Sequence, residues 1–186
     1  FYGRVVDDVA TKSPDLAIGA SDALARDVVG KMQFDFFLAH GLQPQHKFFD
    51  LGCGNLRGGW RIIEYLNEGN YTGVDLSYKV LCSSLKIMAE KKLQAKRPYL
   101  FVLDSCDYGF LPEASFDFAH AHSVYSHLPL ALIESSLSGM YKVLKHNGVF
   151  DFTFLPTDKE PYSFCDEDFY FPAEVLLASC RKVGFR

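Results

Sequence analysis

A short turn rich in glycine follows an apolar segment that ends at Asp50, and its residue types suit a ligand-binding loop. Gly52 and Gly54 stand where the backbone must turn sharply and let a ligand approach it closely. A helix that begins after them would present its unpaired N–H groups to the same ligand. Asp50 adds a negative charge two residues before the first glycine. The turn therefore predicts a ligand that carries positive charge close to Asp50.

The residues around this turn separate two classes of ligand. A dinucleotide-binding turn would have glycine three places after Gly54, and Arg57 stands there instead. The carboxylate of Asp50 would also repel a pyrophosphate held against the turn, whereas it would attract the ammonium and sulfonium of S-adenosylmethionine. We therefore expect S-adenosylmethionine to contact this run, through Asp50, Gly52, Cys53, Gly54, Asn55 and Arg57. The alternative is an ordinary turn with a solvated aspartate.

A second acidic residue, Asp75, stands 25 positions after Asp50 (75 minus 50), where an apolar segment ends. A carboxylate at the tip of a strand can accept hydrogen bonds from both hydroxyls of a ribose. Leu76 would then lie against the adenine, with Ser77 beside it. The alternative is that Asp75 or Ser77 only caps the helix that follows.

A third acidic residue, Asp104, follows the apolar segment 99–103. Its carboxylate would accept a hydrogen bond from the adenine amino group. The backbone N–H of Ser105 or Cys106 would donate to a ring nitrogen of the same base. The alternative is a surface turn that contacts no ligand.

Three histidines lie close together in the run His120-Ala-His-Ser-Val-Tyr-Ser-His127. Side chains alternate along a strand, so His120 and His122 would lie on the same side, with His122 nearer the carboxyl end. Histidine is the usual proton acceptor near neutral pH, and we expect His122 to act as a general base. Ala121 would border the cofactor. His127 is a second catalytic candidate, although all three histidines could instead be partly buried structural imidazoles.

Apolar segments and helical patterns alternate along the chain, which would bring these loops to one edge of a sheet. The predicted strands cover residues 47–51, 71–75, 99–103, 116–121 and 149–155, and the predicted helices cover 56–67, 78–92, 130–144 and 172–183. Such alternation is typical of right-handed βαβ units around a parallel sheet. We therefore expect an α/β fold with a doubly wound, mostly parallel sheet, helices on both faces and the ligand beyond the carboxyl ends of the strands.

The N-terminal part of the chain lies outside this alternation. Residues 1–20 are expected to form an arm or a short helix, and residues 21–186 a single domain. A further helix is predicted from Ser21, capped by Ser21 or Asp22 and ended by Gly41. Its apolar residues share one face, namely Leu24, Val28, Met32, Phe36 and Ala39.

The order and spacing of five short motifs resemble those of the class I S-adenosylmethionine-dependent methyltransferases. The motifs are Asp50-x-Gly-x-Gly, Val74-Asp75-Leu-Ser, Asp104-Ser, Ser115-Phe-Asp117-Phe and Tyr141-Lys-Val-Leu-Lys-His-Asn-Gly148. The last motif has His146-Asn147 where the family has a basic residue and proline. The resemblance covers residues 30–155. Because the family sheet ends with two antiparallel strands, the chain, which stops at Arg186, looks truncated.

The resemblance implies an enzyme that transfers the methyl group of S-adenosylmethionine in line to a nucleophile of a second substrate. We expect the acceptor to be an oxygen or a nitrogen of a small molecule or sugar, and the sequence does not identify which. One alternative is an NAD-dependent oxidoreductase, against which Asp50 and Arg57 argue. Another is a methyltransferase-like domain that binds the cofactor without turnover.

The composition argues against several other classes of protein. A formal net charge of -4 disfavours a nucleic-acid partner, because phosphate binding needs a basic face. Five cysteines without a CxxC pair suit reduced thiols, and no apolar run reaches about 20 residues, so we expect a cytoplasmic protein. No acidic pair or His/Cys cluster has metal-ligand spacing, and no metal is expected. The acidic aromatic run 165–171 is expected to be a solvated loop rather than the lining of a substrate pocket, and the oligomeric state is left open.

Overall fold

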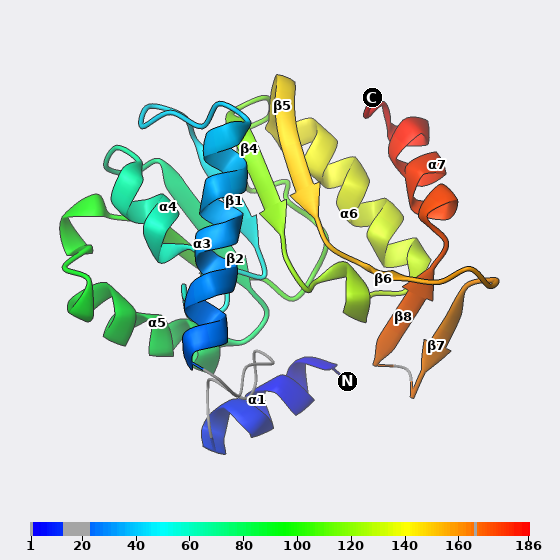
Figure 1. Ribbon diagram of the computed structural model, residues 1–186, viewed down its shortest axis with the longest axis horizontal. Coiled ribbons are helices and arrows are strands. Elements are labelled where there is room, and N and C mark those ends of the chain that lie inside the picture. Colours follow the sequence, from blue (N-terminus) through cyan, green and yellow to red (C-terminus); the bar gives the residue numbers. More distant parts are fainter. Residues whose placement is uncertain (1, 13–22, 166) are drawn as a thin grey trace. The chain divides into compact units, whose positions relative to one another are not determined.

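The computed structural model describes residues 2–12, 23–165 and 167–186. The predicted helix caps Ser21 and Asp22 and the side chain of Leu24 lie outside the described residues. The chain divides into two compact units, Phe1–Asp104 and Ser105–Arg186. Each unit contains parallel strands connected through helices, which confirms the predicted α/β class (Figure 1). The single domain expected over residues 21–186 stays a prediction.

The first unit contains parallel strands in the order β3-β2-β1. They lie at the predicted places, as β1 (Phe48–Leu51), β2 (Tyr71–Asp75) and β3 (Tyr99–Val102). All of β1 and the first four residues of β2 are buried, as expected for apolar parallel strands. Asp50 of β1 lies opposite Gly73 of β2 in the register. The two strands therefore end side by side, which brings the glycine turn and Asp75 to the same edge.

Helices connect and flank these strands. Those described in the first unit are α1 (Tyr2–Lys12), α3 (Ala23–Ala39), α4 (Trp60–Tyr65), α5 (Tyr78–Glu90) and the short 3-10 helix η1 (Gln94–Lys96). The predicted N-terminal arm is therefore helical over α1. The α4 helix is shorter than the predicted helix 56–67. Leu56 has a left-handed φ of 67°, which excludes it from a right-handed helix, and Leu66 has an extended ψ of 157°, which ends the helix.

The apolar face predicted for α3 is exposed. Its exposed fractions are 61% for Val28, 59% for Met32 and 36% for Phe36. The face that carries Gly30 and Gln33 packs on the loop after β1 instead: a Cβ on Gly30 would lie 3.0 Å from the carbonyl oxygen of Arg57, and a Cβ on Gly58 would lie 2.4 Å from Oε1 of Gln33. The close approach at these two glycines determines which side of α3 is buried. The spacing of the apolar residues in the sequence does not predict that side.

The second unit is built around the parallel pair β4 (Phe116–Ala121) and β5 (Leu144–Phe152), which α6 (Leu130–Val143) connects. The buried face of α6 has the predicted spacing and contains Ile133, Leu137 and Met140. β5 begins at Leu144 rather than at residue 149. The turn predicted at Asn147, whose φ is 67°, is an irregularity within β5. Phe116 of β4 pairs with Leu144 and Phe118 pairs with Val149, so the register between the two strands shifts across this part of β5.

A small second sheet follows β5, in the order β6-β8-β7. Its strands are β6 (Leu155–Pro156), β7 (Tyr162–Phe164) and β8 (Asp168–Phe171), and α7 (Ala173–Val183) follows them. Figure 1 shows β7 and β8 as a hairpin beyond the end of β5. The expectation of a solvated loop over 165–171 is therefore wrong for residues 168–171. Tyr162 and Tyr170 are cross-strand partners whose rings stack at 4.8 Å, and Phe171 is buried, so aromatic packing stabilises the strand.

No helix within the described ranges has both the length and the apolar character needed to cross a membrane.

Candidate functional site

The glycine turn after β1 has the backbone geometry that its sequence predicts. Gly52 and Gly54 have φ values of 72° and 58°, the left-handed region that favours glycine. The N–H groups of Gly52 and Cys53 both donate to the carbonyl oxygen of Val74, at 2.8 and 3.0 Å. These two hydrogen bonds connect the turn to the end of β2.

The carboxylate of Asp75 lies beside this turn. Its Oδ2 accepts the N–H of Gly54 and its Oδ1 accepts the N–H of Ser77, both at 2.9 Å. Burial raises the pKa of Asp75 above its usual value, the backbone N–H groups of Ser77, Gly54 and Leu76 oppose that shift, and the charge of Asp7 adds to it. A carboxylate has about four acceptor positions, so these N–H donors do not use all of its capacity, and a ligand hydroxyl can still donate to it. This arrangement fits the predicted role of Asp75 toward a ribose.

Asp50 is 5% exposed and engages a residue that the sequence analysis did not select. Its Oδ2 accepts a hydrogen bond of 2.5 Å from the hydroxyl of Tyr71, the first residue of β2. The signal for this pair is the parallel register, in which Tyr71 lies opposite Phe48, two residues before Asp50 on the same side of β1. Motif spacing alone contains no such information.

Two other side chains of the predicted loop hold it in shape. Cys53 is buried against β2, since a Cβ on Gly73 would lie 2.8 Å from its Sγ, and this burial raises the pKa of the thiol well above its usual range. Asn55 is 5% exposed, and its Oδ1 accepts the N–H of Arg57 at 3.2 Å. Arg57 itself is half-buried. The side chains of Cys53 and Asn55 are thus turned into the unit.

The two residues after Asp75 contact the N-terminal helix. Leu76 is half-buried and packs against the cluster formed by Val6, Ala10 and Val80. Ser77 is fully buried, donates its hydroxyl to Asp7 and accepts the N–H of Val80 at 3.2 Å. Ser77 is therefore the N-cap of α5, the alternative role considered from the sequence.

Asp104 ends the first unit and is exposed. The N–H of Leu103 donates to the carbonyl oxygen of Asp75 at 2.9 Å, so Asp104 follows directly after a residue fastened to the tip of β2. Ser105 and Cys106 open the second unit, Ser105 exposed and Cys106 half-buried.

In the second unit, His120 lies in β4 and His122 is the first residue after the strand. His120 is 3% exposed, and its Nδ1 lies 2.9 Å from Oδ2 of Asp151 on β5. Its ring stacks on that of the half-buried His122, with centroids 5.8 Å apart. Between them, Ala121 is fully buried. Ser123 then adopts a left-handed φ of 56°, and its N–H donates to Oγ1 of Thr153 at 2.8 Å.

His127 lies in the 3-10 helix η2 (Tyr125–His127), ahead of α6 rather than at its start. Its Nδ1 is 2.9 Å from the carbonyl oxygen of Glu167 and 3.2 Å from Oδ1 of Asp168. This ring nitrogen therefore connects the loop after β4 to the hairpin of β7 and β8, which supports the structural alternative for His127.

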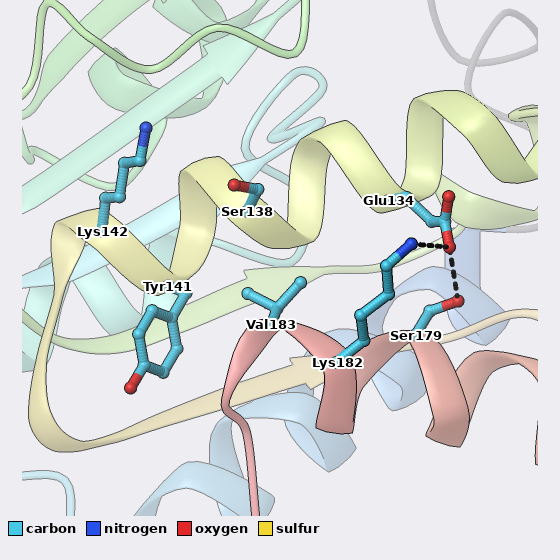
Figure 2. A pocket seen from close by; sticks show the side chains of 7 residues that line it. All are labelled: Glu134, Ser138, Tyr141, Lys142, Ser179, Lys182 and Val183. Carbon is cyan, nitrogen blue, oxygen red and sulfur yellow. Dashed lines mark hydrogen bonds and ion pairs between the residues drawn. The ribbon is translucent and has the colours of Figure 1, made fainter.

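A groove lies between α6 and α7 in the second unit. Figure 2 shows Lys182 and Ser179 of α7 turned toward Glu134 of α6, with contacts of 3.7 and 3.3 Å. Lys182 and Ser179 therefore both contact Glu134, and no predicted site residue lines the groove. Within the residues that the structure describes, no group of three or more His, Cys, Asp or Glu side chains is arranged to hold a metal ion.

Comparison with known proteins connects these features to a family. The sequence model of a methyltransferase domain family matches residues 49–150, more than half of the chain. This match includes both glycines of the turn, Asp75, Asp104 and the candidate histidines His120, His122 and His127.

Solved structures share the fold. Magnesium protoporphyrin IX methyltransferase from Synechocystis, with bound S-adenosylmethionine, is 13% identical with a TM-score of 0.75, covering 100% of this chain and 87% of that one. The cyclase SpnF is 21% identical with a TM-score of 0.71 and coverage of 89% and 60%. Phosphoethanolamine N-methyltransferase 2 from Haemonchus contortus is 20% identical with a TM-score of 0.69 and coverage of 83% and 36%.

The chain spans 60% of the cyclase and 36% of the Haemonchus enzyme. Identities of this size show the fold alone, and one fold supports several reactions. The family match is the independent finding, and it confirms the predicted cofactor, which is also bound in the Synechocystis structure and in another structure of the Haemonchus enzyme. The chain belongs to the class I S-adenosylmethionine-dependent methyltransferases.

Proposed function

We propose that the protein transfers the methyl group of S-adenosylmethionine to an oxygen or a nitrogen of a small-molecule or sugar acceptor. The observation that carries the proposal is the carboxylate of Asp75, which the N–H groups of Gly54 and Ser77 hold at the edge where β1 and β2 end. A carboxylate fixed in this way suits two adjacent hydroxyls and does not suit a phosphate.

Different residues of the first unit contact different parts of the cofactor. Asp75 binds the ribose hydroxyls, the turn of Gly52 and Gly54 allows close approach, and Asp104 accepts from the adenine amino group. Asp50 supplies negative charge for the amino group of the amino-acid portion. The cofactor contributes a methyl group already activated by a positively charged sulfur, so the protein mainly has to align the reactants.

His122 is the residue we assign to proton removal. A ring nitrogen of His122 takes the proton of the acceptor as the acceptor atom bonds to the methyl carbon, and the electrons of the broken S–C bond stay on sulfur. His120 is packed behind His122 and paired with Asp151, so it limits the orientations of the His122 ring. The proton then passes from His122 to water.

Two measurements test this function. Calorimetry should detect S-adenosylhomocysteine binding in about the micromolar range, and the absence of any heat with folded protein would refute cofactor binding. Incubation of the protein with S-adenosylmethionine and a panel of hydroxyl and amine acceptors should release S-adenosylhomocysteine. Binding without release across the panel would favour a domain that holds the cofactor without turnover, and a competing titration with NADH checks the oxidoreductase alternative.

Cofactor binding should weaken on acidification at a pH above the ordinary range of aspartate. Because burial raises the pKa of Asp75 above 3.8, its carboxylate takes up a proton at a higher pH than a free aspartate does. The protonated group offers fewer acceptors to the ribose, so binding and protonation oppose each other. Calorimetry with methylthioadenosine from neutral pH to about pH 4 measures the effect. Asp75→Asn should reduce the pH dependence, and an affinity that stays constant in the wild type would contradict the prediction.

We keep a cytoplasmic location as part of the proposal, supported by the cysteines. All five are free thiols, and two of them, Cys82 and Cys165, are exposed. Exposed unpaired thiols suit a reducing compartment. The acidic net charge supports small-molecule partners over nucleic acid.

A further inference from the structure

The hydroxyl of Tyr71 is buried at the point where three elements of the first unit meet. Tyr71 begins β2 and is 1% exposed, and its hydroxyl donates to Asp50 at the end of β1. Its ring stacks on that of Phe48 with an angle of 1° between the planes and centroids 6.0 Å apart. Gly59, just before α4, closes the other side, since a Cβ there would lie 2.3 Å from the Tyr71 hydroxyl oxygen and 3.3 Å from Oδ2 of Asp50. The packing of these residues therefore fixes the position of the Tyr71 hydroxyl.

The charges around this hydroxyl fix the direction of the hydrogen bond. Burial, and next the negative charge of Asp50, raise the pKa of Tyr71 well above its usual value, so the phenol stays protonated and donates. A buried carboxylate is costly unless a donor compensates it, and the Tyr71 hydroxyl is such a donor. The pair thus keeps a negative charge next to the glycine turn although Asp50 is almost fully buried.

The two oxygens of a carboxylate lie in one plane, so a bond that holds Oδ2 also limits the direction of Oδ1. If a side chain is already oriented before the ligand binds, less binding free energy is lost in ordering it. We propose that Tyr71 is a positioning residue for the cofactor: it fixes the Asp50 carboxylate in the orientation that receives the amino group of the amino-acid portion of S-adenosylmethionine. This inference rests on the proposed function, in which Asp50 faces that amino group.

The test compares two ligands on the variant Tyr71→Phe. S-adenosylhomocysteine has the amino group, whereas methylthioadenosine keeps the adenosine and the sulfur and lacks the amino-acid portion. Calorimetry should show that Tyr71→Phe weakens S-adenosylhomocysteine binding by about tenfold or more, because an Asp50 carboxylate that is no longer held in place loses its charge-assisted hydrogen bond to the amino group. Methylthioadenosine affinity should change by less than about twofold. A purely structural tyrosine would weaken both ligands alike or neither, and either outcome overturns the proposal.

Tyr108→Phe is the matched control. Tyr108 is 2% exposed, and its hydroxyl is 2.7 Å from Oγ of Ser136 in the second unit, so the variant also loses one buried tyrosine hydrogen bond. It should leave the ratio of the two affinities unchanged.

Two further outcomes are separable. If Tyr71→Phe does not fold, as judged by circular dichroism, Asp50→Asn serves as the second variant, because it keeps an oxygen acceptor for Tyr71 and removes the charge. Selective loss of S-adenosylhomocysteine affinity is again expected, and an unselective loss or no loss overturns the proposal. If the wild type binds neither ligand, the proposed function itself fails.

Discussion

Replacement of Asp75 by alanine should reduce the affinity for S-adenosylhomocysteine by about a hundredfold or more. The variant removes the acceptor for both ribose hydroxyls, and hydrogen bonds to a charged group are worth about 1.5–3 kcal/mol each. Two such bonds amount to about 3 kcal/mol or more, which corresponds to about a hundredfold in the dissociation constant. Calorimetry with S-adenosylhomocysteine and methylthioadenosine measures the loss, and both ligands should lose affinity because both contain the ribose.

Asp117→Ala is a suitable control for this variant. Asp117 lies at the beginning rather than the end of a strand, and its carboxylate pairs with Lys145 at 2.7 Å. It should leave both affinities within about twofold of the wild type, as expected of a surface ion pair. Wild-type affinity in Asp75→Ala would contradict the proposed cofactor site.

Asp75→Asn separates the ribose contacts from the shape of the turn. The N–H groups of Gly54 and Ser77 each use one oxygen of the carboxylate, and an amide has only one oxygen. One N–H therefore loses its acceptor, which also loosens the turn. We expect a smaller loss of affinity than with alanine, together with a lower melting temperature of the free protein, measured by circular dichroism.

The parallel strands could be predicted from the sequence because each one corresponds to a short run of neighbouring residues with a recognisable pattern. β1 and β2 are short, mostly apolar runs. β1 is followed by Gly52 and Gly54, whose positive φ suits a turn, and β2 is followed by Ser77, the N-cap of α5. The buried stripe of α6 is local in the same sense.

Features that depend on residues far apart in the chain could not be predicted. The orientation of α3 is set by close packing of Gly30 against the loop at Arg57, and an apolar count selects the wrong face. β8 forms because it pairs with β6 and β7. Neither a helical nor an alternating pattern of apolar residues in the sequence predicts this pairing. The bond between Tyr71 and Asp50 likewise requires the register of two strands.

The candidate cofactor residues followed from residue chemistry, and the structure refines what their side chains do. Asp75 and Gly54 contact each other directly, as a shared site requires. Cys53 and Ser77, in contrast, point into the unit. Cys53 packs against β2, and Ser77 caps α5. Sequence spacing places a residue in a loop, and only packing decides which of its atoms face outward.

Replacement of His122 by alanine should lower kcat by about a hundredfold to a thousandfold while S-adenosylhomocysteine binding stays within about twofold. A positioned general base contributes about that much to a rate, and no cofactor contact is assigned to His122. Release of S-adenosylhomocysteine with an acceptor from the panel gives kcat, and calorimetry gives the affinity. His146→Ala, at an exposed position of β5, is the control and should change neither quantity.

His127→Ala decides between the two catalytic candidates. Because His127 fastens its loop to Glu167 and Asp168, its loss should lower the melting temperature and affect kcat less than the loss of His122. The opposite pattern, with normal stability and a large loss of kcat in His127→Ala, would assign the proton to His127.

The size of the His122 effect also indicates the acceptor atom. A hydroxyl is a weak nucleophile until its proton leaves, whereas a neutral amine can attack with its lone pair and lose the proton afterwards. The loss of kcat in His122→Ala should therefore be large for hydroxyl acceptors and much smaller for neutral amines. A comparison of the two kinds of acceptor on this one variant would separate oxygen from nitrogen methylation, a distinction that the cofactor-binding turn does not make.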